Sequence, residues 1–165
     1  MRNLENTKVR ILTTGGTIDG FDAEKGIAPK ESAIPSLLAQ AKVSEIACEQ
    51  VFAKDSRLIT PKDTQLLAKR CRACEEKAIV ITHGTFTMAA TARFLAKENL
   101  EKTIVLTGSM MPAAKSNSDA QFNLGFALAV AQFLPKGVWV AMNGKVFSND
   151  NVKKNEVAGT FENER

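Results

Sequence analysis

Short, nearly continuous apolar runs alternate along the 165-residue chain with longer segments of helical periodicity. The apolar runs predict five strands, at Val9–Thr13, Ile46–Phe52, Ala78–Thr82, Thr103–Thr107 and Val138–Met142. The periodic segments predict four helices, at Ala33–Ala41, Pro61–Glu76, Thr87–Lys97 and Ser118–Phe133. Buried strands joined through helices are typical of a mostly parallel, twisted sheet flanked by helices on both faces. The sequence therefore predicts an α/β fold.

Local signals set the ends and faces of the predicted helices. Thr60 followed by Pro61 predicts an N-cap with proline at the first helical position, and Thr87 stands where it would cap the next helix. The last helix carries an apolar stripe that we expect to pack on the sheet, made of Phe122, Phe126, Ala129, Val130 and Phe133.

Composition and length favour one globular domain that spans residues 1–165. The net charge of +4 is mild, and aromatic residues make up only 6%, so the pattern does not indicate a nucleic-acid-binding protein. No apolar run approaches the roughly 20 residues that span a bilayer. The N-terminal MRNLENTKVR is polar and unlike a secretion signal. We expect a cytoplasmic protein that binds no membrane.

The three cysteines, Cys48, Cys71 and Cys74, form an odd set that suits a reducing compartment. Cys71 and Cys74 match C-x-x-C, but they lie near the end of a predicted helix rather than at its start, where a reactive thiolate is favoured. The chain has one histidine and no second cysteine pair. We therefore expect two ordinary thiols on a helix and no metal site.

Loops rich in glycine and hydroxyl side chains follow three of the predicted strands. They are Thr13–Thr17, His83–Thr87 and Thr107–Met110. The carboxyl ends of parallel strands meet at one edge of a sheet, where ligands of such folds bind. We therefore expect these loops to form the functional site together.

The chemistry of the first two loops stays open from the residues alone. Gly15-Gly16 favours either a tight turn or a backbone cradle for an oxyanion or phosphate, although it matches neither common nucleotide motif. His83 is interpreted as a structural hydrogen-bonding residue at the end of its strand. The hydroxyl of Thr87 is expected to be engaged in capping.

Two adjacent lysines stand out near the end of the chain. Asn143-Gly144 predicts a type I′ turn that leads into a strand at Lys145–Phe147. Lys153 and Lys154 then follow in what reads as a polar loop. A lysine in a loop is usually solvated, whereas one buried beside hydroxyl groups can act as a general base.

Four short motifs, in order, resemble the bacterial-type L-asparaginase/glutaminase family. They are Thr-Gly-Gly-Thr-Ile at 14–18, Ile-Thr-His-Gly-Thr-x-Thr-Met at 81–88, Thr-Gly-Ser-Met-x-Pro at 107–112 and Asp-Ala-x-Phe-Asn at 119–123. The resemblance covers nearly the whole chain and is to the family's N-terminal, catalytic domain. The smaller C-terminal domain of the family is absent from this sequence, so we expect either a short single-domain member or part of a longer chain.

The resemblance implies an amidohydrolase that converts the side-chain amide of asparagine, or a related small amide, to the acid and ammonia without metal or organic cofactor. By this resemblance Thr17 is the nucleophile, Thr85 is the second catalytic threonine, and Lys154 is the lysine bonded to it, with Lys153 as the neighbouring alternative. The substrate-binding positions that it implies are Gly16, Asp55, Ser56, Gly84, Phe86 and Ser109. Ser56 matches the serine that holds the substrate α-carboxylate, and the resemblance also implies a homo-oligomer, either a dimer or a tetramer.

Two residues depart from the family pattern. The family has an aspartate after the second threonine, which holds the substrate α-ammonium, and this chain has Phe86. The family's lid tyrosine is also missing, with Phe21 or Asp22 in the corresponding stretch. The alternative hypothesis is therefore a weakly active or inactive relative that binds a small molecule. Nucleotide binding at Gly15-Gly16 is a third hypothesis.

Overall fold

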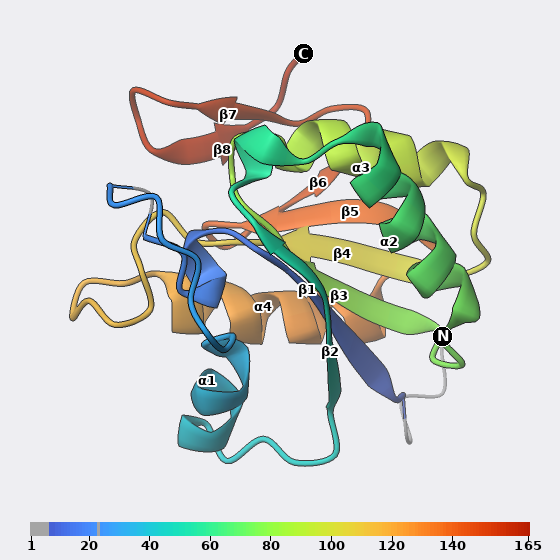
Figure 1. Cartoon of the computed structure of the whole chain (residues 1–165). Helices are drawn as coiled ribbons and strands as arrows, with labels where there is room; N and C mark the ends of the chain where they lie inside the picture. Colours follow the sequence, from blue (N-terminus) through green and yellow to red (C-terminus); the bar gives the residue numbers. More distant parts are fainter. Residues whose placement is uncertain (1–6, 23) are drawn as a thin grey trace.

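The computed structural model describes residues 7–22 and 24–165. Its centre is a six-stranded sheet in the order β2-β1-β3-β4-β5-β6 (Figure 1). Five strands are parallel: β1 (Val9–Gly15), β2 (Ala47–Lys54), β3 (Ala78–Thr82), β4 (Thr103–Thr107) and β5 (Gly137–Met142). The sixth strand, β6 (Lys145–Ser148), is antiparallel to β5. The predicted mostly parallel sheet is confirmed.

Helices cover both faces of this sheet, as the apolar strands predicted. The helices α2 (Pro61–Ala73) and α3 (Met88–Lys97) lie on one face, and α1 (Ile34–Gln40) and α4 (Ala120–Phe133) lie on the other (Figure 1). Side chains of β3 alternate between the two resulting cores, with Ile79 and Ile81 in the first and Ala78 and Val80 in the second. All four are fully buried because neither face of the sheet meets solvent there.

The turn after β5 has the predicted geometry. Asn143 has φ 55° and Gly144 has φ 73°. A type I′ turn needs a positive φ at both central residues, which asparagine and glycine tolerate best. The turn therefore brings β6 back antiparallel beside β5, and the expected hairpin is confirmed.

The expectation that Lys153 and Lys154 lie in a polar loop is wrong. Both belong to β7 (Lys153–Asn155), which pairs antiparallel with β8 (Thr160–Glu162) outside the main sheet (Figure 1). Val152 and Phe161 are buried in the core cluster that also contains α3. Two apolar anchors therefore hold a hairpin that the polar composition of the segment concealed.

The stripe expected to pack α4 on the sheet is also wrong for most of its members. Phe122 and Phe133 are 63% and 66% exposed, and Ala129 is exposed as well, whereas Val130 is buried as expected. The face that meets the sheet consists mainly of smaller side chains: Ala120, Asn123, Leu124, Ala127, Leu128 and Ala131. Small residues let a helix approach a sheet closely. Because α4 is apolar on nearly all sides, its periodicity did not single out that face.

Helix α2 begins as predicted but ends three residues early. Thr60 and Asp63 form a reciprocal capping box at its start. The helix stops at Ala73, so Cys71 lies within it and Cys74 follows it. Burial raises the pKa of Cys71 to about 12, and all three cysteines are free. In the described part of the chain no group of three metal-binding side chains comes together.

Lys102 is a buried lysine that stabilises the end of α2. The residue is 7% exposed. Its Nζ donates to the backbone carbonyl of Cys74 and, at 3.0 Å, to that of Glu76. We expect Lys102→Met to lower the free energy of unfolding by about 1–3 kcal/mol, because two partly buried carbonyls lose a charged donor. Denaturant titration measures this loss. Lys69→Met, at an exposed position of α2, is the matched control, and an equal effect of both changes would contradict the role.

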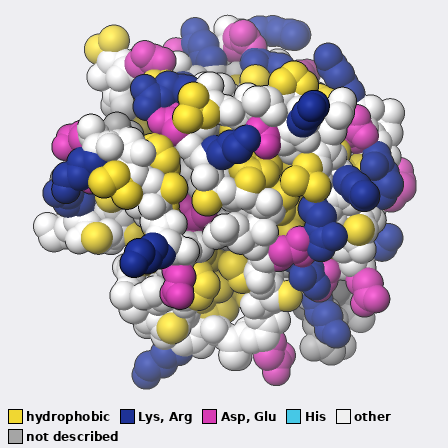
Figure 2. All heavy atoms as spheres, viewed as in Figure 1, with side chains coloured by type: hydrophobic (Ala, Val, Ile, Leu, Met, Phe, Trp, Pro, Cys, Tyr) yellow, Lys and Arg dark blue, Asp and Glu magenta, His cyan; other side chains and the backbone are white. Residues whose placement is uncertain are grey.

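Charged side chains of both signs are interspersed over the face shown in Figure 2, where no single-sign patch forms. None of the helices in residues 7–22 and 24–165 is long and apolar enough to cross a bilayer.

Candidate active site

Three loops meet backbone to backbone at the carboxyl edge of the sheet. Gly16 has φ 78°, and a Cβ atom there would lie 2.4 Å from the backbone nitrogen of Gly84. A Cβ atom on Gly84 would in turn lie 2.7 Å from the Oγ of Ser56. Such separations are far shorter than van der Waals contact, so only glycine fits at either position. Gly16, which the sequence favoured for a tight turn or an anion cradle, therefore packs against a neighbouring loop.

A small hollow lies where these loops meet. It is lined by Gly16, Thr17, Phe21, Asp55, Ser56, Gly84, Thr85 and Phe86. Every residue predicted for the site is in this set except Lys154 and Ser109, and Phe21 is an addition that the sequence placed only in the lid stretch. The hollow measures about 20 Å³. That is room for about one water molecule, so the hollow is small.

Lys154 reaches this site from the β7–β8 hairpin. Its Nζ donates to the Oγ1 of Thr85 over 2.9 Å, a contact between residues 69 positions apart. Burial lowers the pKa of Lys154, Arg57 lowers it further by charge repulsion, and Glu156 opposes both effects. Lys153 points elsewhere and pairs with Glu162 at 3.3 Å. Of the two candidate lysines, the geometry brings Lys154 to the predicted threonine.

Phe86 stands between two cationic groups. The Nζ of Lys154 lies 3.7 Å from the centroid of its ring, and the guanidinium carbon of Arg57 lies 4.8 Å from it. Both distances are within the range of cation–π attraction. The ring is about half exposed, so it forms an outer wall of the hollow.

Ser56 and Asp55 form the wall contributed by the end of β2 and by the short 3-10 helix η2 (Ser56–Leu58). Ser56 is buried, and its Oγ has no hydrogen-bond partner among the described residues. Asp55 accepts from the backbone N–H of Arg57 at 2.9 Å and from its guanidinium. The hydrogen bond from Arg57 lowers the pKa of Asp55. Asp55 is therefore a charged but already paired carboxylate.

The expectation that the Thr87 hydroxyl caps α3 is wrong. Thr87 does precede the first residue of the helix, but its side chain makes no capping bond. Its hydroxyl instead donates to the backbone carbonyl of Ser56 over 2.8 Å. This bond joins the loop after β3 to the loop after β2. The hydroxyl is engaged as expected, but in holding the site together.

His83 is a structural residue, as predicted. It is fully buried, its Nδ1 lies 2.7 Å from the carbonyl of Gly84, and its Nε2 lies 2.9 Å from the hydroxyl of Thr91. Since a carbonyl only accepts, Nδ1 carries the proton and Nε2 accepts from Thr91. Burial lowers the pKa of His83 to about 4, so the ring is neutral near pH 7. It supports the loop that carries Thr85.

The Ser109 side chain does not reach the hollow. Ser109 is buried, and its hydroxyl donates to the carbonyl of Met111 over 2.8 Å. Asp119 holds the same loop by accepting from the backbone N–H groups of Met110 and Met111, each at 3.0 Å. The third glycine- and hydroxyl-rich loop is therefore shaped by its own contacts.

Backbone donors differ in their availability for an oxyanion. The N–H of Gly16 donates to the carbonyl of Lys54 at 3.1 Å and is therefore occupied. The N–H of Thr85 makes no hydrogen bond to the residues that the structure describes. The loop after Gly84 thus offers a free donor beside the hollow, whereas Gly16 does not.

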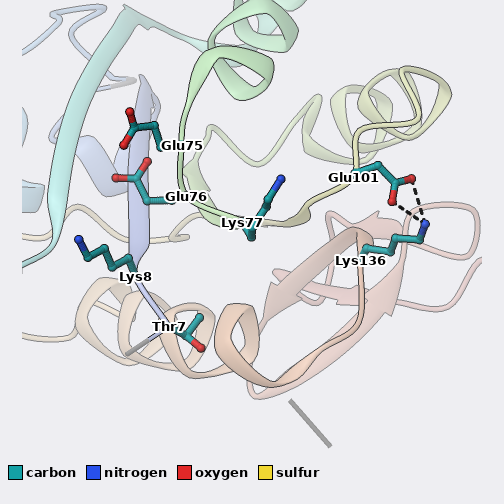
Figure 3. A pocket seen from close by; sticks show the side chains of 7 residues that line it. All are labelled: Thr7, Lys8, Glu75, Glu76, Lys77, Glu101 and Lys136. Atoms are coloured by element: carbon teal, nitrogen blue, oxygen red, sulfur yellow. Dashed lines mark hydrogen bonds and ion pairs between the residues drawn. The ribbon is translucent and has the colours of Figure 1, made fainter. Parts of the chain in front are cut away.

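A larger hollow of about 570 Å³ lies at the opposite edge of the sheet (Figure 3). Its walls carry mainly lysine and glutamate side chains: Thr7, Lys8, Glu75, Glu76, Lys77, Glu101 and Lys136. Lys136 pairs with Glu101 at 2.7 Å, and Glu76 pairs with Arg10 at 2.8 Å. The strands begin at this edge, and Thr17, Thr85 and Lys154 lie at the other, so size alone does not locate the site.

The fold is an α/β domain whose candidate site lies at the carboxyl edge of a mostly parallel sheet. A family model described as "Asparaginase, N-terminal" matches residues 8–162. The chain therefore belongs to the asparaginase family and corresponds to its N-terminal domain.

Relatives and solved structures agree with this assignment. The glutaminase-asparaginase of Pseudomonas aeruginosa is 34% identical, over 90% of this chain and 45% of its own length. The thermostable L-asparaginase of Thermococcus kodakarensis superposes with a TM-score of 0.84 at 34% identity, covering 94% of this chain and 51% of its own. A probable cytoplasmic L-asparaginase of Campylobacter jejuni gives 0.81 at 31% identity, with 94% and 52% covered. The chain spans about half the length of the curated relatives it matches.

Proposed function

We propose that this chain is a threonine-dependent amidohydrolase that converts the side-chain amide of asparagine, or of a related small amide, to the acid and ammonia. The contact that carries the proposal is the 2.9 Å hydrogen bond from Lys154 to Thr85 beside a hollow lined by Thr17. Family membership supports amide hydrolysis as the reaction type. The proposal extends this to a threonine nucleophile and to a chain of this length.

The chemistry follows from the difficulty of attacking an amide. The hydroxyl of Thr17 adds to the amide carbon, ammonia leaves, and water then hydrolyses the resulting ester. Thr85 and Lys154 supply a base for proton transfer without a histidine, and the lowered pKa of Lys154 favours its neutral, proton-accepting form. The N–H of Thr85, which has no partner among the described residues, is the proposed donor to the negative oxygen of the tetrahedral intermediate. No step needs a metal or cofactor.

Ammonia release from a panel of small amides tests this proposal. We expect the chain to release ammonia from at least one of asparagine, glutamine and their analogues, and to form a hydroxamate when hydroxylamine intercepts the ester. Ammonia release without hydroxamate would argue against a covalent intermediate. A chain that releases no ammonia from any amide would contradict the enzymatic proposal.

A weakly active or inactive small-molecule-binding relative is the second candidate. It is favoured by Phe86, which cannot hold an ammonium as a carboxylate does, and by the small volume of the hollow. The same ammonia measurement separates it from the enzyme. Nucleotide binding at Gly15-Gly16 is the weaker alternative, since the N–H of Gly16 is already occupied. It predicts that mononucleotides raise the Tm of the protein.

We also propose a homo-oligomer, a dimer or a tetramer, in the cytoplasm. The exposed rings of Phe122 and Phe133 on α4 offer apolar surface for self-association, and the free cysteines suit a reducing compartment. Light scattering after size exclusion measures the mass in solution, and cell fractionation measures the location. The only other binding partner that we propose is the small amide substrate.

A further inference from the structure

The charges around Phe86 bear on which amide the site accepts. Two cations, Lys154 and Arg57, lie against the ring, and the ring itself carries no charge that would balance them. Arg57 donates to Asp55 through Nε and Nη2, while its Nη1 makes no hydrogen bond to any described residue. Asp55 thus binds one edge of the guanidinium and the Phe86 ring lies against its face, while Nη1 remains available as a donor.

The walls of the hollow contain a single carboxylate, and it already has a partner. Asp55 is the one acidic residue that lines the hollow, and it is paired with Arg57. Among the aspartates of the neighbouring loops, Asp22 pairs with Lys25, and Asp119 accepts from the N–H groups of Met110 and Met111. Asp19 accepts from Ser32 through Oδ1, and its buried Oδ2 has no partner among the described residues, but Asp19 lies outside the lining of the hollow. In the described part of the chain, the walls of the hollow therefore offer no free carboxylate to a substrate ammonium.

An anionic group meets the opposite situation. The Oγ of Ser56 is buried in the wall without a partner, and a hydroxyl in that position can donate to a carboxylate oxygen. Arg57, next in the chain, is not one of the lining residues, but it lies against Phe86 at the outer wall. Its Nη1, which Asp55 does not occupy, is a charged donor of the kind that recognises carboxylates. For a substrate that carries both groups, the carboxylate strengthens binding. The ammonium weakens binding, because burying an unpaired ammonium is costly.

We propose that Arg57 and Phe86 make this site selective for amides that carry one carboxylate and no α-ammonium, such as the monoamides of short dicarboxylic acids. Arg57 and Ser56 hold the carboxylate. Phe86 disfavours the ammonium because its ring already contacts two cations and supplies no negative charge. The inference rests on the proposed amidohydrolase function and names its substrate class.

Matched substrates test this selectivity. Succinamate differs from asparagine only by the missing α-ammonium, and propionamide lacks both charged groups. We expect kcat/KM for succinamate to exceed that for asparagine at least tenfold. Arg57→Gln should lower kcat/KM for succinamate at least tenfold more than for propionamide. Arg72→Gln is the control and should change neither value, because Arg72 is an exposed residue of α2 that pairs with Glu98 at the end of α3.

The reverse substitution supplies a gain of function. Phe86→Asp should raise kcat/KM for asparagine relative to succinamate at least tenfold, because it restores a carboxylate beside the ammonium. The new carboxylate also changes the surroundings of Lys154, but that change affects both substrates and cancels in the ratio of their kcat/KM values. Glu156, in the turn between β7 and β8, is the rival ammonium partner. A selective loss of asparagine turnover in Glu156→Gln, or a native preference for asparagine, would overturn the inference.

A binding readout separates this inference from the proposed reaction. Succinate and aspartate differ by the same ammonium, and their thermal stabilisation of the protein needs no turnover. We expect succinate to raise the Tm more than aspartate, and Arg57→Gln to abolish the difference. If no amide is hydrolysed but succinate still binds preferentially, the reaction fails and the selectivity stands. Equal stabilisation, or none by either acid, contradicts the selectivity.

Discussion

Thr17→Ala is expected to abolish amide hydrolysis, with a loss of roughly 10⁴-fold or more in turnover, the scale seen when a hydrolase loses its nucleophile. Thr17 lines the hollow directly after the Gly15-Gly16 turn, at the start of η1 (Thr17–Asp19). Without its hydroxyl no covalent ester forms, and uncatalysed attack of water on an amide is slow. Steady-state ammonia release measures the effect.

The control for this prediction is stability. The Thr17 hydroxyl makes no hydrogen bond within the described residues, so its removal should leave the Tm almost unchanged. Thr17→Val keeps the branched shape and should be equally inactive, whereas Thr17→Ser keeps a hydroxyl and should recover part of the turnover. Near wild-type turnover in the alanine variant would rule out Thr17 as the nucleophile.

Lys154→Met is expected to lower turnover at least 100-fold, within the range of about 10²–10⁴ that general base catalysis contributes. The substitution keeps the length of the side chain and removes the group that contacts Thr85 at 2.9 Å. Lys153→Met is the adjacent control and should cost little, because Lys153 pairs with Glu162 at the surface. If Lys153→Met proved the more damaging change, the assignment would be wrong by one residue.

The pH profile distinguishes a base from a mere positive charge. A lysine base works in its neutral form, so the rate should rise with pH through the pKa of Lys154. Burial lowers that pKa, so the midpoint of the rise in rate should lie below the ordinary lysine value of 10.5. Lys154→Arg keeps the charge but cannot lose its proton near neutral pH, so it should remain inactive. An active arginine variant would assign Lys154 an electrostatic role instead.

Sequence periodicity predicted the sheet because its central strands are buried on both faces. The runs at Ala78–Thr82 and Thr103–Thr107 are apolar apart from their threonines, and the structure has strands with those same bounds. Periodicity misplaced the packing face of α4 because that helix is apolar nearly all round. It also missed the strand that holds Lys154, because β7 and β8 are short and polar, and they depend on the buried side chains of Val152 and Phe161.

The residue types and their order determined which chemistry is present: two threonines after glycines at strand ends, a lysine late in the chain, and phenylalanine where the family has aspartate. Their meeting was decided by the tertiary structure, since the parallel sheet places loops that are distant in sequence at one edge, and the β7–β8 hairpin brings Lys154 to Thr85 across 69 residues. The pairing of Asp55 with Arg57, the stacking of Arg57 on Phe86, and the choice between Lys153 and Lys154 likewise depend on side-chain directions. Those directions follow from packing against other elements, and local sequence does not encode them.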